Sequence, residues 1–179
     1  MDFLLFGIQG SGKGTHGKKL CEKFGMAYFE TGGALRKLAS SDSELARKIK
    51  QILEAGRLVP NEVVMEILED FLKNLPRGVA ALFDGIPRNE EQARSLETLF
   101  QKYGRTFLAV LLEVPMEVAL ERLVKRRICE KCKTVFPSGY TKAMCDTCGG
   151  KLIQRSDDTE KSIRIRFQIF ETETMPVVE

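Results

Sequence analysis

Short apolar runs alternate with amphipathic stretches along most of the chain. The runs that indicate strands fall at residues 3–6, 26–30, 79–83 and 107–114. Stretches with apolar side chains at helical spacing fall at residues 17–24, 62–73, 90–102, 116–127 and 159–172. Because strands and helices alternate, the pattern predicts a parallel, right-handed α/β sheet, whose ligands bind at the carboxyl ends of the strands.

Two stretches interrupt this alternation. Between residues 30 and 59 the pattern predicts two short helices, one from Thr31 and one over 43–55, and Gly56 ends the second in a left-handed cap. This stretch is too polar and too short to form a core of its own, so we expect a flap on the main domain. The second interruption follows residue 124, where cysteine, lysine and glycine replace the apolar pattern.

A glycine-rich turn, Gly7 to Thr15, joins the first apolar run to the first helix. Residues without a Cβ let several backbone N–H groups surround an anion, and the helix N-terminus adds partial positive charge. Lys13 can reach the terminal phosphates of a bound nucleotide. The spacing G-x-x-x-x-G-K is met, although Gly14 stands where serine or threonine is usual. The turn therefore predicts phosphate binding, and a purely structural strand-to-helix turn is the alternative.

An acidic residue, Asp84, ends the apolar run at 79–83. Since parallel strands end at the same edge of a sheet, its carboxylate is expected beside the phosphate-binding turn. It can hold waters around Mg²⁺ there, or it can cap the turn into the helix at 90–102.

Four cysteines form two C-x-x-C pairs with twelve residues between the pairs. Each pair directs two thiolates to one point, and four thiolates make a closed tetrahedral site suited to Zn²⁺. The segment between them has few large apolar side chains, so a structural metal would supply its folding energy. Four free thiols in a loop are the alternative, and Cys21 is expected in the core. The predicted ligands are Cys129, Cys132, Cys145 and Cys148.

Length and charge restrict the class of protein further. The chain has 179 residues, which suits one compact domain with inserted segments. Its net charge is +3 with both signs interspersed, so nothing indicates a nucleic-acid or membrane partner. No apolar run approaches the length of a membrane span, and Asp2 follows Met1 where a signal peptide would begin. We therefore expect a cytoplasmic protein.

Several of these motifs together resemble the adenylate kinase family of nucleoside-monophosphate kinases, over essentially the whole chain. The turn at 7–15 resembles its phosphate loop, in which Gly and then Thr follow the lysine. Residues 31–36 and 54–60 resemble the start and end of its monophosphate flap, and 83–88 with Gln92 its signature block. Residues 155–158, with nearby arginines, resemble its lid hinge, and the four cysteines are similar to the metal-bearing lid of bacterial members.

The resemblance implies a three-layer α/β/α P-loop fold with a parallel sheet in the order 2-3-1-4, in which the family's fifth strand is missing. It divides the chain into a core of residues 1–29, 60–124 and 159–179, a flap of residues 30–59 and a zinc-binding lid of residues 125–158. It also implies a monomer that transfers a phosphoryl group reversibly from Mg²⁺–ATP to AMP, giving two ADP. Because an open site would hydrolyse ATP, we expect the lid to exclude water, for which the adenylate kinase lid is itself a standard example.

The same resemblance assigns roles to individual residues. The catalytic set that positions and neutralises the transferred group is Lys13, Arg88, Arg126, Arg155 and Arg166. The ATP-binding set is Gly10, Ser11, Gly12, Lys13, Gly14, Thr15, Arg122, Arg126, Val135 and Phe136. The AMP-binding set is Thr31, Arg36, Arg57, Leu58, Val59, Gly85, Arg88, Gln92, Arg155 and Arg166. Asp84 is assigned to Mg²⁺ through water, and Thr31 with Gln92 favours AMP over other monophosphates.

Two departures from the family pattern keep other hypotheses open. Gly33 stands where most members carry an aspartate that helps orient Mg²⁺, and the family's last strand and helix have no counterpart. A nucleotide-binding homologue with weakened or lost activity is therefore one alternative. A zinc-ribbon nucleic-acid binder is the other, motivated by the lysines around the cysteines, but the chain lacks the aromatic platform or basic stripe that such binding needs.

Overall fold

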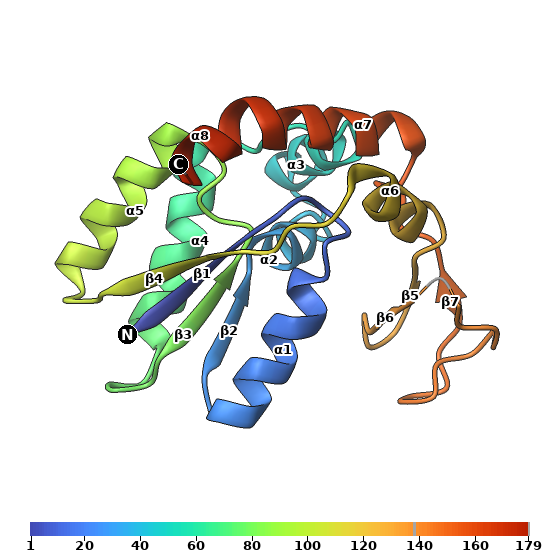
Figure 1. The fold of residues 1–179 in the computed structure, drawn as a ribbon, viewed down its shortest axis with the longest axis horizontal. Coiled ribbons are helices and arrows are strands. Elements are labelled where there is room, and N and C mark those ends of the chain that lie inside the picture. Colours follow the sequence, from blue (N-terminus) through green and yellow to red (C-terminus); the bar gives the residue numbers. More distant parts are fainter. Residues whose placement is uncertain (138, 179) are drawn as a thin grey trace.

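Four parallel strands form the central sheet of the computed structural model, which describes residues 1–137 and 139–178 (Figure 1). The order is β2-β3-β1-β4, as predicted. The strands are β1 (Asp2–Phe6), β2 (Ala27–Glu30), β3 (Ala81–Asp84) and β4 (Phe107–Leu111). Leu4 lies opposite Phe83 on one side and Ala109 on the other, so the first strand of the chain is central in the sheet.

Helices cover both faces of this sheet, which confirms the three-layer architecture (Figure 1). Leu5 and Leu82 pack with Cys21 of α1 (Lys13–Phe24) on one face. Leu4 and Phe83 point to the other face, where they join the largest apolar cluster with α4 (Asn61–Asn74) and α5 (Glu90–Lys102). The alternation follows from the strand period of two, which sends successive side chains to opposite faces.

The segment between β2 and α4 forms two helices that pack onto the core. These are α2 (Thr31–Leu38) and α3 (Glu44–Glu54). Leu35 and Ile49 are buried in the same apolar cluster as Val64 of α4. The Ser43 hydroxyl caps α3 by accepting from the Ala46 N–H at 3.1 Å, and Gly56 takes the predicted left-handed conformation with φ 73°.

The predicted helix over 116–127 is wrong at its end. The helix α6 (Met116–Val124) stops earlier because Arg127 begins β5 (Arg127–Cys129), which pairs on both sides. Its partners are β6 (Val135–Phe136) and β7 (Leu152–Ile153), and together they form a separate antiparallel sheet in the order β6-β5-β7. This small sheet stands out from the central one beyond α6 (Figure 1).

The last part of the chain does not form the single helix predicted over 159–172. The helix α7 (Glu160–Ile169) continues into a π-helical turn, η1 (Phe170–Thr174), and then into α8 (Met175–Val178). Ile163 and Phe167 of α7 pack against Ile8 and Leu123, so this helix closes the cluster behind the glycine-rich turn. Among the described residues, the helices are all too short or too polar to cross a membrane.

The edge strand β4 is the least covered part of the sheet. Phe107 and Leu108 remain 40% and 49% exposed. Among the residues that the structure describes, β4 pairs only with β1, and it is shorter than the predicted run at 107–114 because this pairing ends at Leu111.

Candidate nucleotide site

A cavity of about 860 Å³ lies beside the carboxyl ends of the strands and is bordered by all three parts of the chain. Most residues that the sequence assigns to the site line this cavity. They are Gly10, Ser11, Gly12, Lys13, Gly14, Thr15, Arg36, Arg57, Asp84, Gly85, Arg88, Arg122, Arg126, Val135, Phe136, Arg155 and Arg166. The remaining four, Thr31, Leu58, Val59 and Gln92, line a small hollow that shares Arg57 and Arg88 with the cavity. The individual roles of these residues stay predictions.

The glycine-rich turn needs its glycines for close approach. Gly10 has φ 90°, and a Cβ there would lie 2.6 Å from the carbonyl oxygen of Ala119. The Lys13 ammonium donates hydrogen bonds to the carbonyl oxygens of Gly7 and, at 3.0 Å, of Ile8. Burial lowers the pKa of Lys13 to about 8, although the charge of Asp84 acts in the opposite direction. A phosphate that approached this amine would therefore meet a cation with little hydration to lose.

Buried polar atoms around the cavity have no hydrogen-bond partner within the described part of the chain. Three of them are Gln9 Oε1, Ser11 Oγ and Arg155 Nε, and Thr31 Oγ1 in the adjoining hollow is a fourth. Buried polar groups in folded proteins are nearly always paired, so these atoms indicate that a polar ligand completes the site.

The buried acid Asp158 holds two guanidinium groups beside the cavity. Asp158 accepts from Arg126 Nε at 2.8 Å and Nη2 at 2.6 Å, and from Arg166 Nη2 at 3.1 Å. Burial pushes the pKa of Asp158 upward, but the bonds and charges of Arg126 and Arg166 outweigh it and keep the pKa below its ordinary value. For Arg155, burial and the charges of Arg126 and Arg36 lower the pKa to about 10. This cluster of positive charge is suited to a polyanion.

A second group of contacts fixes Arg88, which also lines the cavity. Its Nε donates to the Gly85 carbonyl at 2.9 Å, and its backbone N–H donates to Gln92 Oε1 at 2.9 Å. The Thr174 hydroxyl in the π-helical turn donates to the Arg88 carbonyl at 2.8 Å. Burial lowers the pKa of Arg88. Sequence analysis missed Thr174, because only the observed backbone brings residue 174 back to residue 88.

Asp84 lies where the sequence predicts it, at the end of β3 and beside the glycine-rich turn. A Cβ on Gly14 would lie 3.6 Å from Asp84 Oδ2, an ordinary contact distance, so the turn and this carboxylate are direct neighbours. Tyr28 donates to the same oxygen at 2.8 Å, and burial raises the pKa of Asp84. A buried carboxylate beside a phosphate site is a hard oxygen donor of the kind that hydrated Mg²⁺ accepts. Asp84 does not cap the following helix, whose N-cap is Asn89. Its hydrogen bond is with Tyr28.

Sequence analysis missed Tyr28, which contacts Asp84, and Glu30, which lines the cavity. Both lie on a short strand, where they pass for ordinary strand residues. The signal that could have found Glu30 is its position, because it ends β2 exactly opposite Asp84 at the end of β3.

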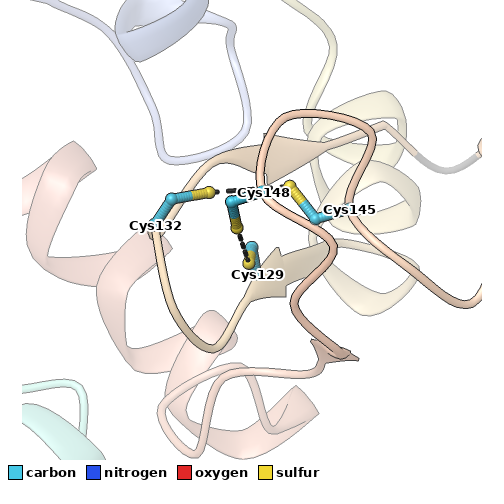
Figure 2. Close-up of side chains that lie close together, drawn as sticks. All are labelled: Cys129, Cys132, Cys145 and Cys148. Carbon is cyan, nitrogen blue, oxygen red and sulfur yellow. Dashed lines mark hydrogen bonds between the residues drawn. The ribbon is translucent and has the colours of Figure 1, made fainter.

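The four cysteines of the two C-x-x-C pairs converge on one point (Figure 2). Their sulfur atoms all lie within 4.8 Å of one another. Cys129 and Cys148 are 3.4 Å apart, and Cys132 and Cys145 are 3.5 Å apart. Four sulfur donors leave no open coordination position, so this donor set fits a structural Zn²⁺. Cys21 lies apart from them in the core, as predicted.

A parallel sheet in this order, with a glycine-rich loop between β1 and α1 and a basic cavity at the strand ends, defines a P-loop nucleotide-binding protein. The sequence profile of the adenylate kinase family matches residues 5–179. An adenylate kinase of Clostridium tetani is 37% identical over all of this chain and 85% of that protein. The adenylate kinase of Caldicellulosiruptor bescii is 36% identical over 100% of the chain and 86% of its own length. The adenylate kinase of Kosmotoga olearia is 37% identical over 99% of the chain and 85% of its own length. The chain therefore belongs to the adenylate kinase family and is a nucleoside-monophosphate kinase.

Proposed function

We propose that this protein transfers the terminal phosphoryl group of Mg²⁺–ATP to AMP, reversibly, to give two ADP. The observation that carries the proposal is that a single cavity joins the phosphate loop to a second arginine wall at Arg36 and Arg88. Two phosphate-binding groups in one cavity suit two nucleotides that meet at their phosphates. The names of the relatives support the same substrates.

At the ATP end, Lys13 exchanges the carbonyl oxygens of Gly7 and Ile8 for the β and γ phosphates. Arg126, Arg155 and Arg166 surround the transferred group and neutralise the charge that spreads over its oxygens in the transition state. Arg122, which lies within hydrogen-bond reach of the Gly10 carbonyl at 3.3 Å, packs against the adenine. Val135 and Phe136 of the lid cover the adenine from the other side.

At the AMP end, Arg36 and Arg88 bind the monophosphate. The planar guanidinium offers two parallel donors to a phosphate, which a lysine cannot reproduce. The small hollow beside them takes the base, where the unpaired Thr31 hydroxyl and the Gln92 amide read the adenine edge. Arg57, Leu58 and Val59 complete its wall, and Gly85 lets Arg88 approach closely.

The chemistry that Mg²⁺ supplies when bound is neutralisation of phosphate charge. Asp84 would hold the metal through its waters, and the hydrogen bond from Tyr28 keeps one Asp84 oxygen oriented. The reaction needs no nucleophile from the protein, because phosphoryl transfer depends on positioning and on neutralisation of charge.

Each of the three parts of the chain has its own role in the reaction. The core, residues 1–29, 60–124 and 159–179, carries the phosphate loop, the flap of residues 30–59 carries the AMP site, and the lid of residues 125–158 closes over both. Zn²⁺ in the lid is a structural clip with no part in the reaction, and we propose that the protein acts as a monomer.

A coupled assay with ATP, Mg²⁺ and each of AMP, UMP, CMP and GMP tests the function. We expect turnover with AMP, and Arg88→Lys should lower kcat/KM by about a hundredfold because the two-pronged contact is lost. ATP binding without turnover would instead indicate an inactive homologue. Tight, strongly salt-dependent oligonucleotide binding would indicate a nucleic-acid binder, a hypothesis that neither comparison favours.

A further inference from the structure

Two carboxylates leave the central sheet side by side at the edge of the cavity. Glu30 ends β2 and Asp84 ends β3, and the two residues lie opposite each other in the parallel pairing. Both line the cavity together with Lys13 of the phosphate loop. The proposed function gives a task to Asp84 and leaves Glu30 without one.

The Glu30 side chain folds over Gly33 in the first turn of α2. A Cβ on residue 33 would lie 3.2 Å from Glu30 Oε2 and 3.3 Å from its Cδ, which is tighter than ordinary van der Waals contact. Glycine at position 33 therefore leaves room for the Glu30 carboxylate, which fills space that a side chain at 33 would use. The other oxygen, Oε1, accepts from Arg36 Nη2 at 2.7 Å.

The two carboxylates place negative charge on one wall of the cavity. Burial raises the pKa of Asp84 and the charge of Glu30 adds to that rise, while the charge of Lys13 and the hydrogen bond from Tyr28 act in the opposite direction. A nucleotide bound at the phosphate loop would bring further negative charge to the same wall. Mg²⁺ keeps several of its waters and is held in proteins by one or two carboxylates together with substrate phosphates. Glu30 and Asp84 provide that number of carboxylates on one wall of the cavity.

We infer that Glu30 is a metal-positioning residue of this enzyme: with Asp84, it accepts hydrogen bonds from the waters of the Mg²⁺ that accompanies ATP. The inference rests on the proposed function. A glycine at position 33 has no carboxylate to offer the metal. Glu30 supplies one from nearly the same place, so the site keeps two acidic groups.

Calorimetry with a non-hydrolysable ATP analogue, in excess chelator and in excess Mg²⁺, tests this inference. The ratio of the two affinities gives the preference of the metal for protein-bound over free nucleotide, because binding linkage is reciprocal. Glu30→Gln keeps the shape of the side chain and should lower this ratio roughly tenfold, as loss of an outer-shell metal partner does. The matched control is Glu97→Gln, on the exposed face of α5, which should leave the ratio unchanged.

A second pair of variants tests whether the position of the carboxylate matters, and not only the identity of residue 30. Glu30→Ala should lower the affinity ratio by a similar factor. Glu30→Ala combined with Gly33→Asp should restore most of the ratio, because a carboxylate returns to the same space. An unchanged ratio in Glu30→Gln would overturn the inference, and an altered metal-free affinity for AMP in that variant would then show that Glu30 acts through Arg36 alone. If the unmodified protein bound no ATP analogue under either condition, the proposed function would fail instead.

Discussion

The flap and the lid are both insertions that border the cavity, yet different forces hold them. The flap helices α2 and α3 place Leu35 and Ile49 in the large apolar cluster of the core, with 4% and 1% of their surfaces exposed. The lid instead surrounds a separate small cluster made of Cys129, Phe136, Cys145 and Leu152. Two of these four residues are predicted metal ligands.

This difference indicates which interactions stabilise the fold of each insertion. Burial of apolar side chains in a shared core ties the flap to the stability of the whole domain. The lid has a much smaller apolar cluster of its own, so we expect its order to depend on metal and on the ion pairs at its base. The five predictions that follow separate these two cases, from the largest expected effect to the smallest.

Removal of metal from the four-cysteine site should unfold the lid and spare the flap. Structural zinc contributes about 10 kcal/mol or more in small zinc-dependent units, far more than the lid's own core can supply. Cys145→Ser should therefore give fast hydrogen exchange across residues 125–158 and normal protection across 30–59. Cys21→Ala, which removes a thiol outside the cluster, is the control. Unchanged exchange in the lid of metal-free protein would contradict the comparison.

Asp158→Asn should loosen the base of the lid. Asp158 is buried and binds both Arg126 and Arg166, so its loss leaves Arg126 without this counter-charge and leaves Arg166 with Asp157 alone, which should cost about 3 kcal/mol. Urea unfolding with hydrogen exchange of the lid would measure this. The control is Glu160→Gln, whose ion pair with Arg164 is exposed.

The same ion pairs predict a pH dependence. Because the pKa of Asp158 is lower in the folded protein, its contribution to stability is complete above the ordinary pKa of an aspartate and is lost as the pH falls through the lower folded value. The protein should therefore lose stability below that ordinary value, and Asp158→Asn should show a smaller loss over the same range. An identical acid titration of stability in both proteins would contradict the assignment.

Ile49→Ala should destabilise the whole domain and not the flap alone. Truncation of this buried side chain removes apolar contacts and leaves a cavity, with an expected cost of about 3 kcal/mol. The midpoint of urea unfolding should fall accordingly, while the exposed Leu45→Ala on the same helix should have little effect. If instead flap exchange became fast with an unchanged midpoint, the flap would be an independent unit.

Ser43→Ala should have the smallest effect, about 1 kcal/mol, because it removes the N-cap of α3. The measurement is hydrogen exchange of the first turn of α3, together with the unfolding midpoint. Ser43→Asp retains an acceptor oxygen and should remain close to the original protein. A loss of equal size in Ser43→Asp would show that the capping bond is not responsible.

Features that depend on residues close together in the sequence could be predicted from the sequence. The glycine-rich turn, the left-handed cap at Gly56 and the convergence of the two C-x-x-C pairs all depend on short spacings with a known geometry. The strand order came from the family resemblance, since periodicity alone leaves the order of four strands open.

Features that depend on distant residues could not be predicted in the same way. Arg127 continues the helical pattern of 116–124, but pairing with Phe136 places it in a strand. Nothing near Thr174 indicates that the helix widens there and reaches Arg88. Likewise, the role of Glu30 depends on Asp84, which is a neighbour in space because β2 pairs with β3.

The central position of β1 has a consequence for how the chain is made. Its two neighbours are β3 and β4, so the strand that leaves the ribosome first can complete neither pairing until residues 81–84 and then 107–111 have emerged. Contacts of such long sequence separation form slowly because the intervening loop must close first. We therefore expect the nascent polypeptide to carry β1 as an unpaired apolar segment until residues 81–84 have emerged, and chaperones could bind this segment during that period.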